Sequence, residues 1–320
     1  MKRRSLLTGA AGAIALGTIG CAPESARLRA VPASGSGHAI GSRGIASLVE
    51  ARHSVDGAGV SLTRHTATAA LEALDPFVLL DEIHSSRPAD YERGFPSHPH
   101  RGFETVSIML NGRFRHRDSH GGGGLVVPGG AQWMTAGAGI VHSEMPENDP
   151  GSTEVFGFQL WVNLPRAEKW QPAAYEEITP DRVPEVALDA GGAMRVIAGE
   201  LLGARGPVAT RTTQPVLATL RMAAGEDVEL AIPRDHAAFL LAAEGSPRIG
   251  SREEVVPEGA LAQLESRGER VRIRSERPSQ LLFLAGAPIR EPIAHGGPFV
   301  MTTQEEIEQA FADYRAGRLG

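Results

Sequence analysis

From Phe95 to Glu104 the chain reads Phe-Pro-Ser-His-Pro-His-Arg-Gly-Phe-Glu, which places His98 and His100 two residues apart. Successive side chains of a β-strand alternate between its two faces, and each residue rises about 3.3 Å. If this stretch is a strand, both imidazoles therefore project side by side from one face and can reach the same ion. The spacing predicts half of a metal site on a β-strand.

A second pair with the same spacing follows in Val-His-Ser-Glu-Met, where His142 and Glu144 also stand two residues apart. If the two strands are neighbours, three imidazoles and one carboxylate converge on one point. Six of the eleven histidines fall between positions 84 and 142. The remaining three of these six are interpreted as ordinary core or surface residues: His84, His116 and His120.

The types of these side chains indicate which metals they could bind. Imidazoles with one carboxylate and no thiolate suit Fe(II), Mn(II), Ni(II), Cu(II) or Zn(II). Four protein ligands around an ion that can take six leave two positions open, and open positions permit catalysis. Glu104 lies an even number of residues from His98 and His100, so the spacing alone would admit it as a further ligand. We favour a different interpretation, in which Glu104 accepts hydrogen bonds from the ligands or is a surface charge. Arg101 and Trp133 either line and support the site or simply pack.

Composition indicates a soluble, turn-rich and mostly β protein. The chain has 320 residues, enough for two domains of ordinary size. Its 38 Gly and 22 Pro break the apolar runs into short segments, a pattern typical of a β-sandwich or barrel. The net charge of −6 argues against a general nucleic-acid binder, so no nucleic-acid partner is expected.

The first 21 residues have the layout of a signal peptide. A basic start, Met-Lys-Arg-Arg-Ser-Leu-Leu, precedes an apolar run of small residues to Ile19, and no acidic residue occurs before Glu24. The run is shorter than the roughly 20 apolar residues of a membrane span. Arg3 and Arg4 resemble a twin-arginine signal, the bacterial route that exports folded proteins. We therefore expect an exported, periplasmic protein.

Cys21 is the only cysteine, and it stands where the signal would be cut. It resembles the lipid-modified cysteine of bacterial lipoproteins, so a membrane-anchored lipoprotein and a plainly cleaved periplasmic protein are both open alternatives. A single cysteine excludes an intrachain disulfide. Residues 22–43, rich in Ala, Pro, Ser and Gly, are predicted to form a flexible spacer.

Four motifs together resemble the pirins, a branch of the cupin superfamily. They are Phe95-Pro-Ser-His-Pro-His-Arg-Gly-Phe-Glu-Thr105, Gln132-Trp-Met-Thr-Ala-Gly137, Gly139-Ile-Val-His-Ser-Glu144 and Leu160-Trp-Val-Asn-Leu-Pro165. The similarity continues through Arg195-Val-Ile-Ala-Gly199 and Gly297-Pro-Phe-Val-Met301. Departures from the family pattern occur at the four-glycine run 121–124, at Gly130 and at Thr302.

The resemblance implies an all-β bicupin, with two cupin β-barrels and a short C-terminal helix. The metal-binding barrel is expected over residues 44–168, with His98, His100, His142 and Glu144 as ligands. A metal-free barrel is expected over 169–290, where His236 is the only histidine. In the tail, 291–320, Thr303 and Glu306 predict a capped helix whose apolar stripe is Ile307, Ala310, Phe311 and Tyr314, ending at Gly317.

The resemblance also implies a function. Several pirins are associated with quercetin 2,3-dioxygenase activity, so we expect metal-dependent ring opening of a flavonol, or of a related enolic or phenolic compound, with O2. Fe(II) is the expected metal, with Mn, Ni, Cu or Zn as alternatives, and Glu144 could act as general base. The alternative is a non-enzymatic regulator that senses iron redox state and binds a protein partner the sequence does not identify. A third reading is a purely structural ion.

Overall fold

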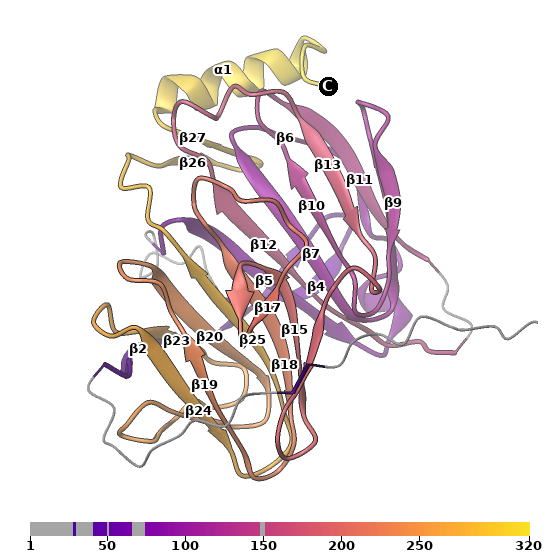
Figure 1. The fold of residues 1–320 in the computed structure, drawn as a ribbon. Helices are drawn as coiled ribbons and strands as arrows, with labels where there is room; N and C mark the ends of the chain where they lie inside the picture. Colours follow the sequence, from indigo (N-terminus) through magenta and orange to yellow (C-terminus); the bar gives the residue numbers. More distant parts are fainter. Residues whose placement is uncertain (1–27, 30–40, 50, 66–73, 148–150) are drawn as a thin grey trace, which may run out of the picture.

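The computed structural model describes residues 28–29, 41–49, 51–65, 74–147 and 151–320. The predicted signal peptide, Cys21 and most of the predicted spacer lie outside these described residues. Among the residues that are described, no helix is long and apolar enough to cross a membrane. The described residues form two β-barrels and a C-terminal α-helix, as the sequence predicts (Figure 1).

The first barrel combines a seven-stranded and a four-stranded sheet. The seven strands, in spatial order, are β13 (Ala174–Ile178), β10 (Ala131–Thr135), β7 (Phe103–Asn111), β12 (Val155–Asn163), β5 (Phe77–Ser85), β4 (Val60–Arg64) and β3 (Arg52–Asp56). The four strands are β6 (Phe95–His100), β11 (Ile140–Glu147), β8 (Arg113–Asp118) and β9 (Gly123–Val126). Both predicted metal-binding motifs therefore lie in the smaller sheet, on β6 and β11.

The second barrel combines an eight-stranded and a four-stranded sheet. The eight strands are β1 (Leu28–Arg29), β14 (Glu185–Ala187), β15 (Ala193–Ala198), β18 (Val216–Met222), β25 (Ser279–Gly286), β20 (Ala237–Glu244), β23 (Leu261–Leu264) and β2 (Ile45–Val49). The four strands are β19 (Glu226–Ala231), β24 (Arg270–Ser275), β21 (Arg248–Ile249) and β22 (Glu254–Val255). Short elements complete the fold: η1 (Pro88–Asp90), β16 (Glu200–Leu201), β17 (Ala204–Arg205), β26 (Ala294–Gly296) and β27 (Phe299–Met301).

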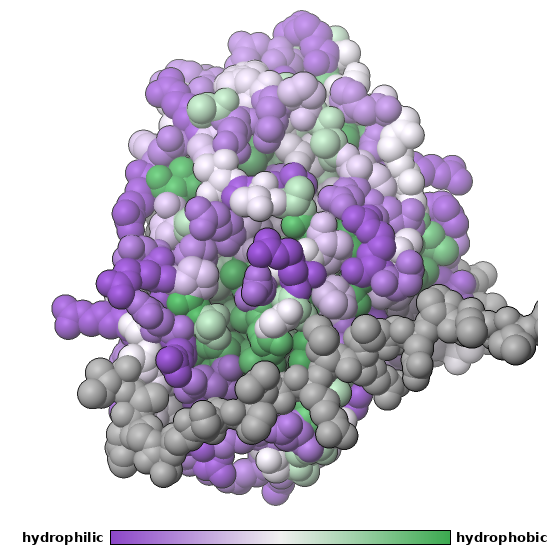
Figure 2. All heavy atoms as spheres, viewed as in Figure 1, coloured by the Kyte–Doolittle hydropathy of each residue, from purple (hydrophilic) through white to green (hydrophobic). Residues whose placement is uncertain are grey.

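Alternating side chains of the large sheets build two cores. On β20, Leu240 and Ala242 belong to the core of the second barrel, whereas Phe239 and Leu241 belong to a core shared with the first, where the Phe239 ring meets Phe77 at 5.9 Å. This period of two is what a strand buried on both faces requires. The surface in Figure 2 is correspondingly hydrophilic over most of the molecule, with hydrophobic residues visible mainly over the second barrel.

Two strands pair across the predicted domain boundaries. The segment Ile45–Val49 was expected in the first barrel, but β2 pairs with β23 of the second. Conversely, β13 follows the predicted boundary at residue 168 and pairs with β10 of the first barrel. Arg43 helps to hold β2 in place: it is fully buried and donates hydrogen bonds to the carbonyl oxygens of Gly268 and His236 at 2.9 and 2.7 Å.

The C-terminal tail packs against the first barrel, and α1 (Gln304–Arg315) lies over its end farthest from the second barrel (Figure 1). The predicted capping box is present, because Thr303 accepts from the backbone N–H of Glu306 and the Glu306 side chain accepts in return. The predicted apolar stripe is only half correct. Ile307 and Ala310 are buried, whereas Phe311 and Tyr314 remain 36% and 40% exposed.

Candidate metal centre

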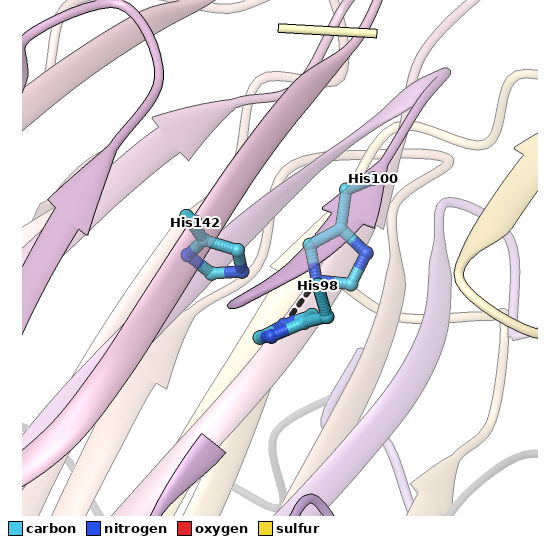
Figure 3. A group of neighbouring side chains, drawn as sticks. All are labelled: His98, His100 and His142. Carbon is cyan, nitrogen blue, oxygen red and sulfur yellow. Dashed lines mark hydrogen bonds between the residues drawn. The ribbon is translucent and has the colours of Figure 1, made fainter. Parts of the chain in front are cut away.

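Three histidines from two neighbouring strands meet in the first barrel. Strands β6 and β11 are antiparallel, and the register places His142 directly opposite His98. The nitrogen atoms that His98, His100 and His142 offer all lie within 4.8 Å of one another. Figure 3 shows the three rings turned toward a common point, with His98 and His100 on one strand and His142 on the other. The three imidazoles therefore converge as the spacing in the sequence predicts.

The hydrogen bonds of two rings assign their protons. His98 donates from Nδ1 to the Pro96 carbonyl at 2.8 Å, and His100 donates from Nδ1 to the Pro298 carbonyl at 3.0 Å. A carbonyl oxygen only accepts, so in each neutral ring the proton is on Nδ1 and Nε2 carries a lone pair. The Pro298 contact reaches across from the C-terminal tail, and no sequence pattern indicates it, because any backbone carbonyl could serve.

The arrangement of these lone pairs fits a metal ion. The Nε2 atoms of His98 and His100 lie 3.1 Å apart with no proton between them. Two imidazoles bound at right angles to one ion, each at about 2.1 Å, would have nitrogens about 3 Å apart. His142 Nε2 is also buried and has no hydrogen-bond partner among the described residues. All three nitrogens are thus available to a cation.

Burial keeps two of these rings neutral. Burial, with the nearby charge of His98 as a second cause, lowers the pKa of His100 to about 3. Burial likewise lowers the pKa of His142, with His100, His98 and His116 as further causes. At neutral pH both rings therefore remain unprotonated, the form that binds metals.

Glu144 lies beside the imidazoles and is held by three neutral donors. Its Oε1 accepts from the Ser107 hydroxyl at 3.0 Å and from the Gln132 amide, and its Oε2 accepts from the Gln159 amide at 2.6 Å. The ligand atoms of Glu144, His142 and His116 lie within 4.8 Å of one another, but Glu144 does not belong to the group formed by His98, His100 and His142. A bulge between His142 and Glu144 shifts the strand register at this point. That Glu144 completes the ligand set stays a prediction.

His116, interpreted from the sequence as an ordinary residue, belongs to the centre. It is 1% exposed, its Nδ1 lies 3.3 Å from His142 Nδ1, and its Nε2 lies 3.1 Å from an oxygen of Asp118. The Tyr175 ring stacks on it at 4.4 Å. One signal could have identified it: His116 and Asp118 share the spacing of two that marked the other pairs.

A cavity of about 580 Å³ opens beside the imidazoles. His98 and His100 contribute to its wall, together with the flat or apolar side chains of Leu79, Phe95 and Trp161. Polar groups also line it, namely Arg64, Asp81, Gln159 and, from the tail, His295. The Trp161 indole N–H donates to Gln159 at 3.2 Å, and Gln159 in turn donates to Glu144, so the cavity wall is connected to the carboxylate.

The other three sequence candidates lie outside this cavity lining. Arg101 donates to the Ala138 carbonyl at 2.6 Å and to Asp313 on α1 at 2.8 Å, so it fastens the tail to the strand that carries His100. Glu104 is buried, accepts from Thr135 at 2.7 Å and lines a separate cavity of about 270 Å³; burial raises its pKa. Trp133 is 1% exposed and packs in the core shared by the barrels.

The second barrel has a different character. Within its described residues no group of His, Cys, Asp and Glu side chains comparable to the first barrel's is present. His236 donates a ring N–H to the Gln214 carbonyl at 3.1 Å, an ordinary structural contact. The candidate metal groups in the described chain all lie in the first barrel.

Comparisons with known proteins agree with this architecture. A family described as "Pirin" matches residues 59–162, and one described as "Pirin C-terminal cupin domain" matches residues 217–320. A Pseudomonas aeruginosa protein named "Putative quercetin 2,3-dioxygenase" is 47% identical over 82% of this chain and 93% of its own length. The "Pirin" of Homo sapiens is 38% identical over 85% of this chain and 92% of its own length.

A solved structure supports the same conclusion. The crystal structure of quercetin 2,3-dioxygenase from Acinetobacter baumannii aligns with a TM-score of 0.79 and 33% identity, covering 87% of this chain and 99% of that one. Two barrels, a histidine cluster confined to the first, and relatives matched over nearly their whole length lead to one assignment. The chain belongs to the pirin family of cupin proteins.

Proposed function

We propose that this pirin is a metal-dependent dioxygenase that opens the ring of a flavonol such as quercetin, or of a related enolic or phenolic compound, with O2. One observation carries the proposal: three imidazoles with free Nε2 atoms converge beside a cavity of about 580 Å³ that also has flat aromatic walls. The names of the similar Pseudomonas and Acinetobacter proteins support the substrate class.

His98, His100, His142 and Glu144 would hold the ion. We favour Fe(II), with Mn, Ni, Cu and Zn as alternatives, because imidazole and carboxylate ligands accept all of them. When bound, such an ion would supply Lewis-acid and redox chemistry toward an ionised hydroxyl and O2.

The chain's own residues would bind and orient the substrate. Trp161 packs edge-on against His100 at 5.2 Å and offers a flat wall for an aromatic ring. Glu144, if it releases one of its three donors, can take the proton of the substrate hydroxyl as general base. The apolar side chains of Leu79 and Phe95 would exclude water from the reacting atoms.

The test is metal analysis of anaerobically purified protein, followed by quercetin absorbance and O2 consumption. Wild-type protein should contain about one metal per chain and consume both substrates. His98→Ala should lose metal and turnover together, whereas His236→Ala, in the second barrel, should keep both. Turnover at the wild-type rate by metal-free His98→Ala protein would refute the mechanism.

The same assay separates the alternatives. Iron-loaded protein that leaves quercetin and O2 untouched, but binds another protein in one redox state only, would favour a redox-sensing regulator. Loss of stability on metal removal with no activity to lose would indicate a structural ion.

We further propose that the protein works outside the cytoplasm, on the strength of the signal-like start and Cys21. Fractionation of cells that express the full chain and a Cys21→Ser variant would show whether it is exported and whether it is anchored to a membrane.

A further inference from the structure

We propose that Asp118 and His116 form a hydrogen-bonded relay that fixes the proton of His142 on Nδ1 and thereby keeps its Nε2 free for the metal ion. Both are positioning residues, and the inference rests on the proposed metal function of His142. It also gives a role to Gly122, one of the glycines in the run 121–124.

His142 differs from His98 and His100 in the group that its Nδ1 atom contacts. The Nδ1 atoms of His98 and His100 meet carbonyl oxygens, which can only accept a hydrogen bond. The Nδ1 of His142 instead meets another imidazole nitrogen, Nδ1 of His116, at 3.3 Å. A ring nitrogen can donate or accept, so the proton of His142 is defined only if something else fixes His116.

Asp118 provides that constraint. A carboxylate only accepts, so the 3.1 Å contact from its Oδ2 places a proton on Nε2 of His116. In its neutral form, which the relay requires, His116 has a single N–H, so its Nδ1 is then the acceptor. The N–H in the pair therefore belongs to Nδ1 of His142, and its Nε2 keeps a lone pair. That atom is buried and has no hydrogen-bond partner in the described chain.

The glycine loop holds Asp118 in this orientation. The Oδ1 atom accepts the backbone N–H groups of His120 and Gly122, both at 2.9 Å, which directs Oδ2 toward His116. A Cβ atom at position 122 would lie 2.3 Å from Oδ2 of Asp118, so only glycine leaves the carboxylate room. The His116 and Asp118 side chains are 0% and 1% exposed, and water has little access to either. The stacked ring of Tyr175 fixes the plane of His116.

Asp118→Asn tests the relay because it preserves shape and reverses one hydrogen bond. The amide oxygen can keep both backbone N–H groups, which leaves the NH2 group facing Nε2 of His116. His116 would then carry its proton on Nδ1 and donate to His142, whose own proton would move to Nε2. We expect metal affinity to fall by about 10- to 100-fold, the usual effect of losing a partner that orients a ligand.

The direct readout is the ¹⁵N NMR spectrum of histidine side chains in the folded, metal-free protein. Wild type should show His142 protonated on Nδ1 and His116 on Nε2, and Asp118→Asn should reverse both. Fe(II) affinity is then measured anaerobically against a competing chelator. Glu177→Gln is the matched control: Glu177 accepts the backbone N–H of Leu125 beside the same loop, at 3.1 Å, but does not touch His116. It should change neither protonation nor affinity.

The outcomes are distinguishable. Protonation of His142 on Nε2 in wild type, or a doubly protonated His116, would overturn the relay even if Asp118→Asn failed to fold. Unchanged protonation and affinity in folded Asp118→Asn would overturn it as well. Wild-type protein that binds no metal would instead refute the proposed function, and the spectrum of the metal-free protein would still decide the relay.

Discussion

Lys169 joins three parts of the chain through one ammonium group. It is 1% exposed, and its Nζ donates to the Gly102 carbonyl at 2.7 Å, to Asn163 Oδ1 at 2.6 Å and to the Val300 carbonyl at 2.9 Å. Burial lowers its pKa to about 8. Gly102 has φ +87°, and a Cβ there would meet the Val300 oxygen at 2.1 Å, so glycine is needed for this close approach.

Replacing Lys169 with Met should therefore destabilise the protein strongly. Three buried oxygen acceptors would lose their donor, and each unsatisfied group costs about 1–3 kcal/mol, so we expect a loss of about 3 kcal/mol or more. Urea denaturation measures the free energy of unfolding. Arg166→Met, an exposed cation three residues away, is the control and should change it little; equal effects of the two variants would contradict the role given to Lys169.

At the scale of residues, the sequence predicted the metal-binding histidines from their spacing, but not the groups that accept hydrogen bonds from their rings. His98, His100 and His142 could be predicted because a spacing of two fixes a shared face of a strand. The partners that set their protons could not. The carbonyl of Pro298 has no sequence signature, and the spacing of two between His116 and Asp118 becomes informative only once β8 is known to lie beside β11.

Asp313 shows how one element is attached to the barrel. On α1 it accepts from Arg101 at 2.8 Å, from Arg318 at 2.7 Å and from Gln309 at 2.7 Å. The hydrogen bond from Arg101, followed by that from Arg318, lowers the pKa of Asp313 from 3.8 to about 2. Its charge therefore anchors the helix next to the strand of His100.

This pKa shift predicts a pH dependence. Because the folded pKa is below the unfolded value, the stabilising contribution of Asp313 is fully present above about pH 4 to 5 and is lost as the pH falls toward 2. Asp313→Asn should unfold at a lower temperature than wild type at pH 7, and the difference should shrink as the pH approaches 2. Glu308→Gln, an exposed acidic residue of the same helix, is the control. A difference that stays constant down to pH 2 would exclude this role.

Element types were more predictable than element partners. The strand expected for His98 and His100 is present as β6 (Phe95–His100), because a local spacing of two is enough to indicate a strand. The partner of Ile45–Val49 depends on contacts more than 200 residues away, which no local pattern encodes. For α1 the sequence predicted the capping box, but not which residues of the apolar stripe would be buried.

For the molecule as a whole, a bound ion should act as a clamp. The candidate ligands come from β6 and β11, and the tail carbonyl of Pro298 holds one of them, so an ion would bind the folded chain but not the unfolded one. We expect chelation to lower the melting temperature and restored metal to raise it again. His98→Ala should not respond to either treatment. A wild-type melting temperature that is indifferent to metal would contradict tight binding at this centre.

Each barrel is completed by a segment from the opposite end of the chain. β2, from the N-terminal part, pairs in the second barrel, whereas residues 294–319 pack on the first. During synthesis the N-terminal barrel therefore cannot be completed before the segment with Pro298, which holds His100, has left the ribosome. The imidazole cluster therefore matures only after this later segment has been made, so metal loading would follow synthesis of a part of the chain almost 200 residues beyond His100.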